Sequence, residues 1–165
     1  MTSPLLSNLN TNLEGTKMAK VLVIYHTLSG NTEKMAKAVA EGAKSVAGIE
    51  VVVKKAFDTT LEDLIECDGV AFGSADYFSY IAGALKDFFD RTFYPSRGKV
   101  DGKPCIAFGT GGGGGDTVVG VLERICYNAF KLKKVADSIS ASGKISDSDL
   151  KECSEAGKKL AEAVK

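Results

Sequence analysis

The sequence predicts an α/β domain in which helices cover both faces of a parallel β-sheet. Short, almost uniformly apolar segments alternate with longer segments whose apolar residues recur at helical spacing. Alternation of this kind favours parallel strands joined by right-handed crossovers. A hydroxyl-rich loop, residues 27–32, separates the first such strand from the first such helix. Loops at the carboxyl ends of parallel strands are therefore where we expect a functional site.

Length and composition favour one globular domain. The chain has 165 residues, of which 44% are hydrophobic and 25% charged. We assign residues 20–165 to this domain and expect residues 1–19 to be a flexible amino-terminal extension, because they are largely polar and lack the apolar centre of a signal peptide.

The charges balance, since Lys plus Arg and Asp plus Glu both total 21. A net charge of zero gives no general attraction to nucleic acid or anionic membranes, so we expect neither nucleic-acid binding nor membrane insertion. The only histidine is His26, and the four cysteines show no C-x-x-C spacing, which argues against a metal site. Free buried thiols suit a reducing compartment, so we expect a cytoplasmic protein.

The first strand and helix frame the most informative loop. Residues 21–24 are apolar and predict a buried strand, and an amphipathic pattern follows Gly30 with apolar positions Met35, Ala36, Val39, Ala40, Ala43, Val46 and Ala47. Unpaired N–H groups and the dipole at the start of such a helix favour an anion, so the loop predicts a phosphate site. The alternative is an ordinary helix cap made by Ser29 or Asn31.

The remaining elements follow in the same order. Further strands are expected at 50–55, 69–73, 104–108 and 132–136. Capping boxes are expected to start helices at Thr59 with Glu62 and at Ser146 with Asp149. A helix should cover the second half of 74–91, with Ile81, Leu85, Phe88 and Phe89 inward. Another should begin at the N-cap Asp116 and bury Val118, Leu122, Ile125 and Ala129.

Residues 24–36, IYHTLSGNTEKMA, resemble the flavodoxin signature, in which the loop after the first strand holds the phosphate of FMN. This resemblance implies a flavodoxin-like three-layer sandwich with a five-stranded sheet in the order 2-1-3-4-5, and FMN as the cofactor. It implies that the phosphate is bound by Thr27, Leu28, Ser29, Gly30, Asn31 and Thr32.

A second loop follows the third predicted strand and carries three aromatic residues. Aromatic side chains here can cover a flat heterocycle, so we expect cofactor contacts from Ser74, Ala75, Asp76, Tyr77, Phe78 and Tyr80. For Phe78, core packing is an equal alternative. Residues 73–91 resemble WrbA-type quinone reductases, which share Gly73, the hydroxyl of Ser74, Phe78, Ala82-Gly83 and Phe89-Asp90-Arg91.

The third loop is glycine-rich. In the flavodoxin fold the corresponding loop lies along the edge of the flavin ring, which implies cofactor contacts from Gly109, Thr110, Gly111, Gly112 and Gly113. The alternative is a flexible surface loop.

The resemblance implies two functions. The first, which the second loop favours, is an FMN-dependent reductase that passes electrons from NADH or NADPH to a quinone-like acceptor. The second is a short-chain flavodoxin that carries single electrons between redox-partner proteins. Such carriers usually have an acidic excess, which this chain lacks, although Asp68, Asp76, Asp87 and Asp116 would give a local acidic rim. The sequence leaves open whether the chain is an enzyme and whether it forms a homo-oligomer.

Overall fold

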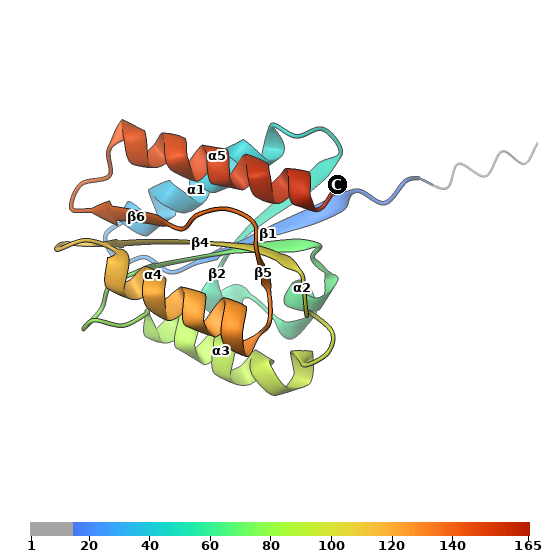
Figure 1. Ribbon diagram of the computed structural model, residues 1–165, viewed down its shortest axis with the longest axis horizontal. Helices are drawn as coiled ribbons and strands as arrows, with labels where there is room; N and C mark the ends of the chain where they lie inside the picture. Colours follow the sequence, from blue (N-terminus) through green and yellow to red (C-terminus); the bar gives the residue numbers. More distant parts are fainter. Residues whose placement is uncertain (1–14) are drawn as a thin grey trace, which may run out of the picture.

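A computed structural model describes residues 15–165 and shows a parallel sheet between two layers of helices (Figure 1). The strands are β1 (Ala19–Tyr25), β2 (Ile49–Lys55), β3 (Gly69–Ala75), β4 (Pro104–Gly111), β5 (Lys133–Lys134) and β6 (Ile139–Ser142). Every pair is parallel, and the order β2-β1-β3-β4-β5 confirms the predicted topology. The order of β1 and β3 at the centre places the loops that follow them side by side.

Helices cover both faces of the sheet, as predicted. The α-helices are α1 (Asn31–Lys44), α2 (Leu61–Glu66), α3 (Gly83–Ser96), α4 (Asp116–Glu123) and α5 (Asp147–Ala163), with a 3-10 turn η1 (Ala56–Asp58) and a π-helical segment η2 (Arg124–Ala129). Figure 1 shows α1 and α5 on one face, and α2, α3 and α4 on the other. Each face has its own apolar core. Residues 21–24 of β1 are buried, because adjacent residues point to opposite faces and both faces are covered.

Two short strands, β5 and β6, occupy the edge of the sheet where the sequence predicted one strand, at 132–136. Lys133 and Lys134 pair with the start of β4, and β6 pairs with its end. Between them residues 135–138 lie outside the strands, and the hydroxyl of Ser138 donates to a carboxylate oxygen of Glu123 at 2.7 Å. Two short strands therefore share one edge of the sheet, and the carboxyl end of β6 reaches the predicted site.

The helix after β4 changes its hydrogen-bonding pattern. The N–H group of Phe130 donates to the carbonyl of Ile125 at 3.0 Å, which is a π-type bond. A π turn contains more residues than an α turn, so the residues that point inward after it are not the ones that α-helical spacing predicts. Cys126 and Phe130 are consequently buried while Ala129 is exposed, and the predicted inward position of Ala129 is wrong.

Two predicted caps are displaced by one residue. The capping box of α2 pairs Thr60 with Asp63, because the hydroxyl of Thr59 donates instead to the carbonyl of Lys55 at 2.8 Å. The N-cap of α4 is Gly115 rather than Asp116, which is the first helical residue. The capping box of α5 is confirmed at Ser146 and Asp149.

The amino-terminal prediction falls mainly outside the described residues, since 1–14 are not among them. Within the described part of the chain, β1 begins at Ala19, two residues before the predicted strand. The helices of residues 15–165 include none that is long and apolar enough to cross a membrane. The four cysteines are buried free thiols, as predicted.

Candidate functional site

The three predicted loops meet at the carboxyl edge of the sheet, and hydrogen bonds join them. The amide of Asp76, after β3, donates to the carbonyl of Thr110 in β4 at 2.7 Å. Gly143, after β6, donates its N–H to Gly111 at 3.0 Å, and its carbonyl accepts from the side chain of Asn31 at 3.4 Å. Segments far apart in sequence thus form one continuous surface.

The phosphate loop is built around Gly30. This residue is the N-cap of α1 and has φ of 96°, a conformation that glycine adopts without strain. Its N–H donates to the hydroxyl of Thr27 at 2.9 Å, which closes the loop. No side chain in the described part of the chain caps the helix. The predicted alternative, a cap made by Ser29 or Asn31, is therefore wrong, and the first-turn N–H groups lack that partner.

Thr32 is the most informative residue of this loop. Its side chain is only 1% exposed, yet its hydroxyl oxygen has no hydrogen-bond partner within residues 15–165. A buried hydroxyl without a partner costs about 1–3 kcal/mol, so the position is unfavourable unless something else supplies the bond. Leu28 and Ser29, at the tip of the same loop, are exposed.

The second loop is a tight hairpin. Tyr77 and Tyr80 exchange backbone hydrogen bonds of 3.0 and 3.2 Å, and the two residues between them, Phe78 and Ser79, have φ of 59° and 62°. Neither is glycine, so the turn carries backbone strain. Asp76 offsets part of it, since its carboxylate accepts the N–H of Ser79 at 2.7 Å.

Phe78 is fully exposed at the tip of this hairpin. The alternative prediction of core packing is therefore wrong. Ser74 is buried, and its hydroxyl accepts the N–H of Ala82 at 2.9 Å and donates to the carbonyl of Ala75 at 2.7 Å. The side chain of Ser74 thus shapes the loop, whereas Tyr77, Phe78 and Tyr80 offer rings at its surface.

Tyr77 links the second loop to the phosphate loop. Burial raises the pKa of its phenol, against a smaller opposite effect of a backbone hydrogen bond with Leu28. Its ring lies edge-on to His26 at 6.0 Å between centroids, and His26 meets Phe57 in the same way at 6.1 Å. Burial, and to a smaller extent the charge of Lys55, lower the pKa of His26, which favours the neutral imidazole at pH 7.

The glycine-rich loop is shorter than predicted, because Gly109, Thr110 and Gly111 are still in β4. Gly109 is closely packed, since a methyl group there would crowd Val118 of α4. Gly112 and Gly113 form the exposed turn, and a methyl group on either would meet no atom within 4 Å. Packing therefore accounts for Gly109, whereas Gly112 and Gly113 border open space beside the other loops.

Sequence reasoning missed two contributors, Gly143 and Phe57. Gly143 follows the alternating segment Ile139–Ser142, which marks a short edge strand. That pattern would have placed Gly143 at the carboxyl edge. Phe57 had no comparable signal, because a lone aromatic residue after a strand is usually part of the core.

Comparisons with known proteins agree with this geometry. The chain matches the family model described as Flavodoxin over residues 23–157. The chain belongs to the flavodoxin family. It is 36% identical over 162 residues to a flavodoxin of Aquifex aeolicus (strain VF5), covering 89% of this chain and 88% of that relative.

Solved structures support the flavodoxin fold. A flavodoxin from the domain Archaea aligns with a TM-score of 0.77 and 28% identity over 88% of this chain and 98% of that one. A flavodoxin, WrbA-like protein from Agrobacterium tumefaciens aligns with a TM-score of 0.74 over 88% and 97% of the two chains. At 20% identity, that second likeness shows the fold alone.

Flavodoxins bind FMN, and the loop of this flavodoxin fits the phosphate of that cofactor. The unpaired hydroxyl of Thr32 and the uncapped start of α1 provide donors for phosphate oxygens. Bound FMN supplies one- and two-electron redox chemistry, and the protein supplies position and exclusion of water. The residues that would hold FMN are Thr27, Ser29, Asn31 and Thr32 toward its phosphate, and Tyr77, Phe78 and Tyr80 would offer rings to its flavin.

The predicted acidic rim is only partly present at this edge. Asp76 and Asp116 lie there, and Asp58 follows β2 at the same edge. Asp68 lies at the opposite end, because it precedes β3 and accepts the N–H of Lys20 at 2.8 Å. Including Asp68 in the rim was therefore wrong.

Proposed function

We propose that this flavodoxin carries single electrons between redox-partner proteins through FMN bound at the carboxyl edge of the sheet. The observation that carries the proposal is the 36% identity to a flavodoxin over 89% of the chain. The likeness to a WrbA-like protein is weaker, so the reductase favoured by the second loop becomes the competing hypothesis.

The surface around the loops supports a role in protein encounters. Phe78 and Leu28 are exposed at the tips of adjacent loops, where a partner would approach the redox centre. Exposed apolar side chains at a loop tip lose water on docking, which favours association. In this proposal a partner covers the FMN site, and no substrate pocket is needed beside it.

The test is an oxygen-free titration of the full chain loaded with FMN, followed by absorbance. We expect that NADH and NADPH alone leave the flavin oxidised, and that stepwise chemical reduction shows two separate one-electron potentials. Rapid bleaching by NADH or NADPH, with turnover when a quinone is added, would support the reductase instead. Failure of the chain to take up FMN would contradict both functions.

A matched pair of variants separates the phosphate loop from the general fold in this assay. Ser29→Ala removes an exposed hydroxyl of the loop, and Ser148→Ala removes an exposed hydroxyl of α5. We expect FMN to bind more weakly only in Ser29→Ala, by roughly tenfold to a hundredfold for one hydrogen bond to a charged group. Equal affinities of the two variants would remove Ser29 from the proposed site.

A further inference from the structure

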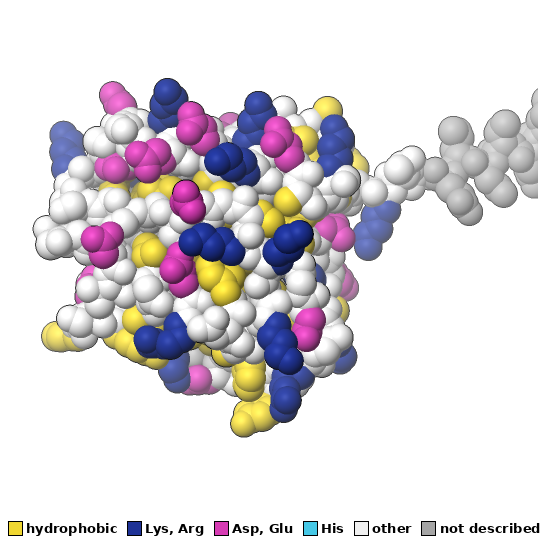
Figure 2. Space-filling model, viewed as in Figure 1, with side chains coloured by type: hydrophobic (Ala, Val, Ile, Leu, Met, Phe, Trp, Pro, Cys, Tyr) yellow, Lys and Arg dark blue, Asp and Glu magenta, His cyan; other side chains and the backbone are white. Residues whose placement is uncertain are grey.

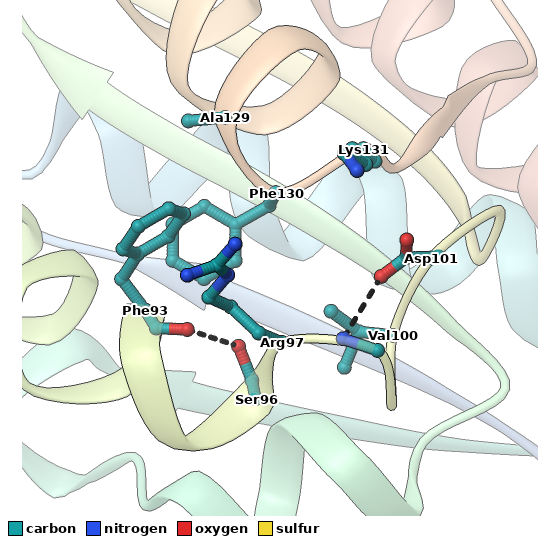
Figure 3. Close-up of a pocket in the computed structure, with 9 residues that line it drawn as sticks. Phe93, Ser96, Arg97, Val100, Asp101, Ala129, Phe130 and Lys131 are labelled. Atoms are coloured by element: carbon teal, nitrogen blue, oxygen red, sulfur yellow. Dashed lines mark hydrogen bonds between the residues drawn. The ribbon is translucent and has the colours of Figure 1, made fainter.

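A cavity lies at the end of the molecule opposite the proposed FMN site, where α3 and η2 end (Figure 3). It has a volume of about 380 Å³ and is lined by side chains of Phe93, Arg97, Val100, Ala129, Phe130 and Lys131. Volumes of this size are typical of sites for small ligands. Because α3 runs about 20 Å from the second loop to this end, the cavity is separate from the proposed FMN site.

Two aromatic rings and a guanidinium group define the chemistry of this cavity. The rings of Phe93 and Phe130 meet at 69° with centroids 5.3 Å apart. The guanidinium of Arg97 lies 6.0 Å from the centroid of Phe93, and Figure 3 shows it beside both rings. A flat aromatic ring can stack on such a surface, and a guanidinium group binds carboxylate or phosphate oxygens in its plane.

The charge around the cavity is positive although the whole chain is neutral. Arg97 and Lys131 line it, and neither takes part in an ion pair within residues 15–165. Asp101 is the one carboxylate among the lining residues described, and it accepts the N–H of Gly98, another lining residue, at 3.2 Å; two cationic side chains therefore face a single carboxylate. Figure 2 shows Lys and Arg side chains gathered on this part of the surface. An anion is therefore favoured there.

The π-helical segment opens the cavity. Its wider turn directs Phe130 into the core and leaves the small side chain of Ala129 at the edge. Single π turns within helices occur frequently at functional sites.

We propose that this cavity binds a small planar aromatic anion. The ring packs on Phe93 and Phe130, and the carboxylate or phosphate group accepts hydrogen bonds from Arg97 and Lys131. This site is independent of the proposed electron transfer, because none of its residues belongs to the loops at the carboxyl edge.

The experiment is an amide NMR titration of the full chain, loaded with FMN, with 2-naphthoate as the probe. We expect saturable shifts at Gly98, Val100 and Lys131, and none within residues 27–32. The uncharged 2-naphthamide has the same shape and should bind about tenfold more weakly, since it lacks the charge-assisted bond. Equal binding of the acid and the amide, shifts confined to residues 27–32, or no saturable shift would overturn the proposal.

Variants test the residues. Arg97→Gln should weaken 2-naphthoate about tenfold, whereas Lys133→Gln, a nearby exposed lysine outside the lining, should change it less than about twofold. Ala129→Leu fills the opening without altering charge and should abolish binding while FMN affinity stays unchanged. Wild-type binding of 2-naphthoate by both Arg97→Gln and Ala129→Leu would overturn the proposal.

Discussion

Among single residues, Thr32 most directly supports a phosphate site at the start of α1. Its hydroxyl is buried without a partner in the described chain, whereas the equally buried Thr92 donates to the carbonyl of Phe88 at 2.6 Å. A buried polar group without a partner lowers stability unless a ligand satisfies it. The hydroxyl of Thr32 therefore lowers the stability of the FMN-free protein but would strengthen the binding of a phosphate.

Replacing Thr32 by valine tests both effects of the hydroxyl, on stability and on FMN binding. Thr32→Val should leave the free energy of unfolding of the FMN-free protein unchanged or slightly higher, and should weaken FMN about tenfold or more. Urea unfolding and fluorescence titration with FMN measure the two quantities. Thr92→Val is the matched control and should keep the affinity for FMN within about twofold. A loss of stability in Thr32→Val with unchanged affinity would show that the hydroxyl serves the fold.

At the scale of elements, α2 depends on the ion pair between its capping residue Asp63 and Lys54 of β2. The ammonium nitrogen of Lys54 lies 2.8 Å from the carboxylate of Asp63, and both side chains are partly buried. Burial by itself would raise the pKa of Asp63, but hydrogen bonds from Lys54 and Thr60 outweigh it, so the pKa lies below its ordinary value.

This pKa predicts a pH-dependent contribution to stability. A carboxylate whose pKa is lowered by folding stabilises the fold above the unfolded value of about 3.9, and the contribution is lost as pH falls through the folded value. Asp63→Asn should therefore lower the free energy of unfolding by about 0.5–1 kcal/mol at pH 7, with a smaller difference at pH 3. Urea unfolding at both pH values measures it. Asp90→Asn, in the exposed pair with Lys86, should cost less. An equal loss at both pH values would exclude the charge as the cause.

The contact between α1 and α5 depends on Gly157. A methyl group there would overlap the carbonyl of Val39, whereas one at Gly120, on the exposed side of α4, would meet no atom within 4 Å. Gly157→Ala should thus destabilise the protein by at least about 2 kcal/mol, because close-packed backbones cannot accommodate it. Gly120→Ala should stabilise it by about 0.5–1 kcal/mol through helix propensity. Thermal unfolding compares the two, and equal effects would show that the helices can separate without cost.

Most elements could be predicted from the sequence, because apolar periodicity reports directly which faces are buried. Residues 21–24 illustrate this, as does the capping box at Ser146. Periodicity assumes a regular helix, so it could not reveal the π turn that buries Phe130 in place of Ala129. It also could not show that β5 stops at Lys134, after which Ser138 donates a hydrogen bond to the distant Glu123.

At the site, the hairpin with positive φ at Phe78 had no local signal in the sequence, because such strain is held by contacts of the whole loop.

For the whole molecule, a net charge of zero conceals an uneven distribution. Asp58 and Asp116 lie at the carboxyl edge, beside the proposed FMN site, whereas Arg97 and Lys131 lie at the other end. Part of this polarity is expected for parallel α/β folds, because acidic residues are favoured at helix starts and basic residues at helix ends. Asp58 and Asp116 therefore place negative charge beside the proposed FMN site, where it would favour an encounter with a basic partner.

This distribution predicts how electron transfer depends on salt and on particular carboxylates. With a basic c-type cytochrome as acceptor, the second-order rate constant for the chemically reduced, FMN-loaded chain should fall as ionic strength rises, because screening weakens attraction beyond about 10 Å at 0.1 M salt. The double variant Asp58→Asn, Asp116→Asn should lower that constant by about threefold to tenfold at low salt and flatten the salt dependence.

Glu66→Gln is the control. It removes an exposed carboxylate at the opposite end of the sheet and should leave the rate constant within about 1.5-fold of the original. Stopped-flow absorbance measures the rate constants of the original chain, the double variant and Glu66→Gln. Equal decreases of the rate constant in the two variants would show that net charge, rather than the carboxylates beside the FMN site, steers the encounter.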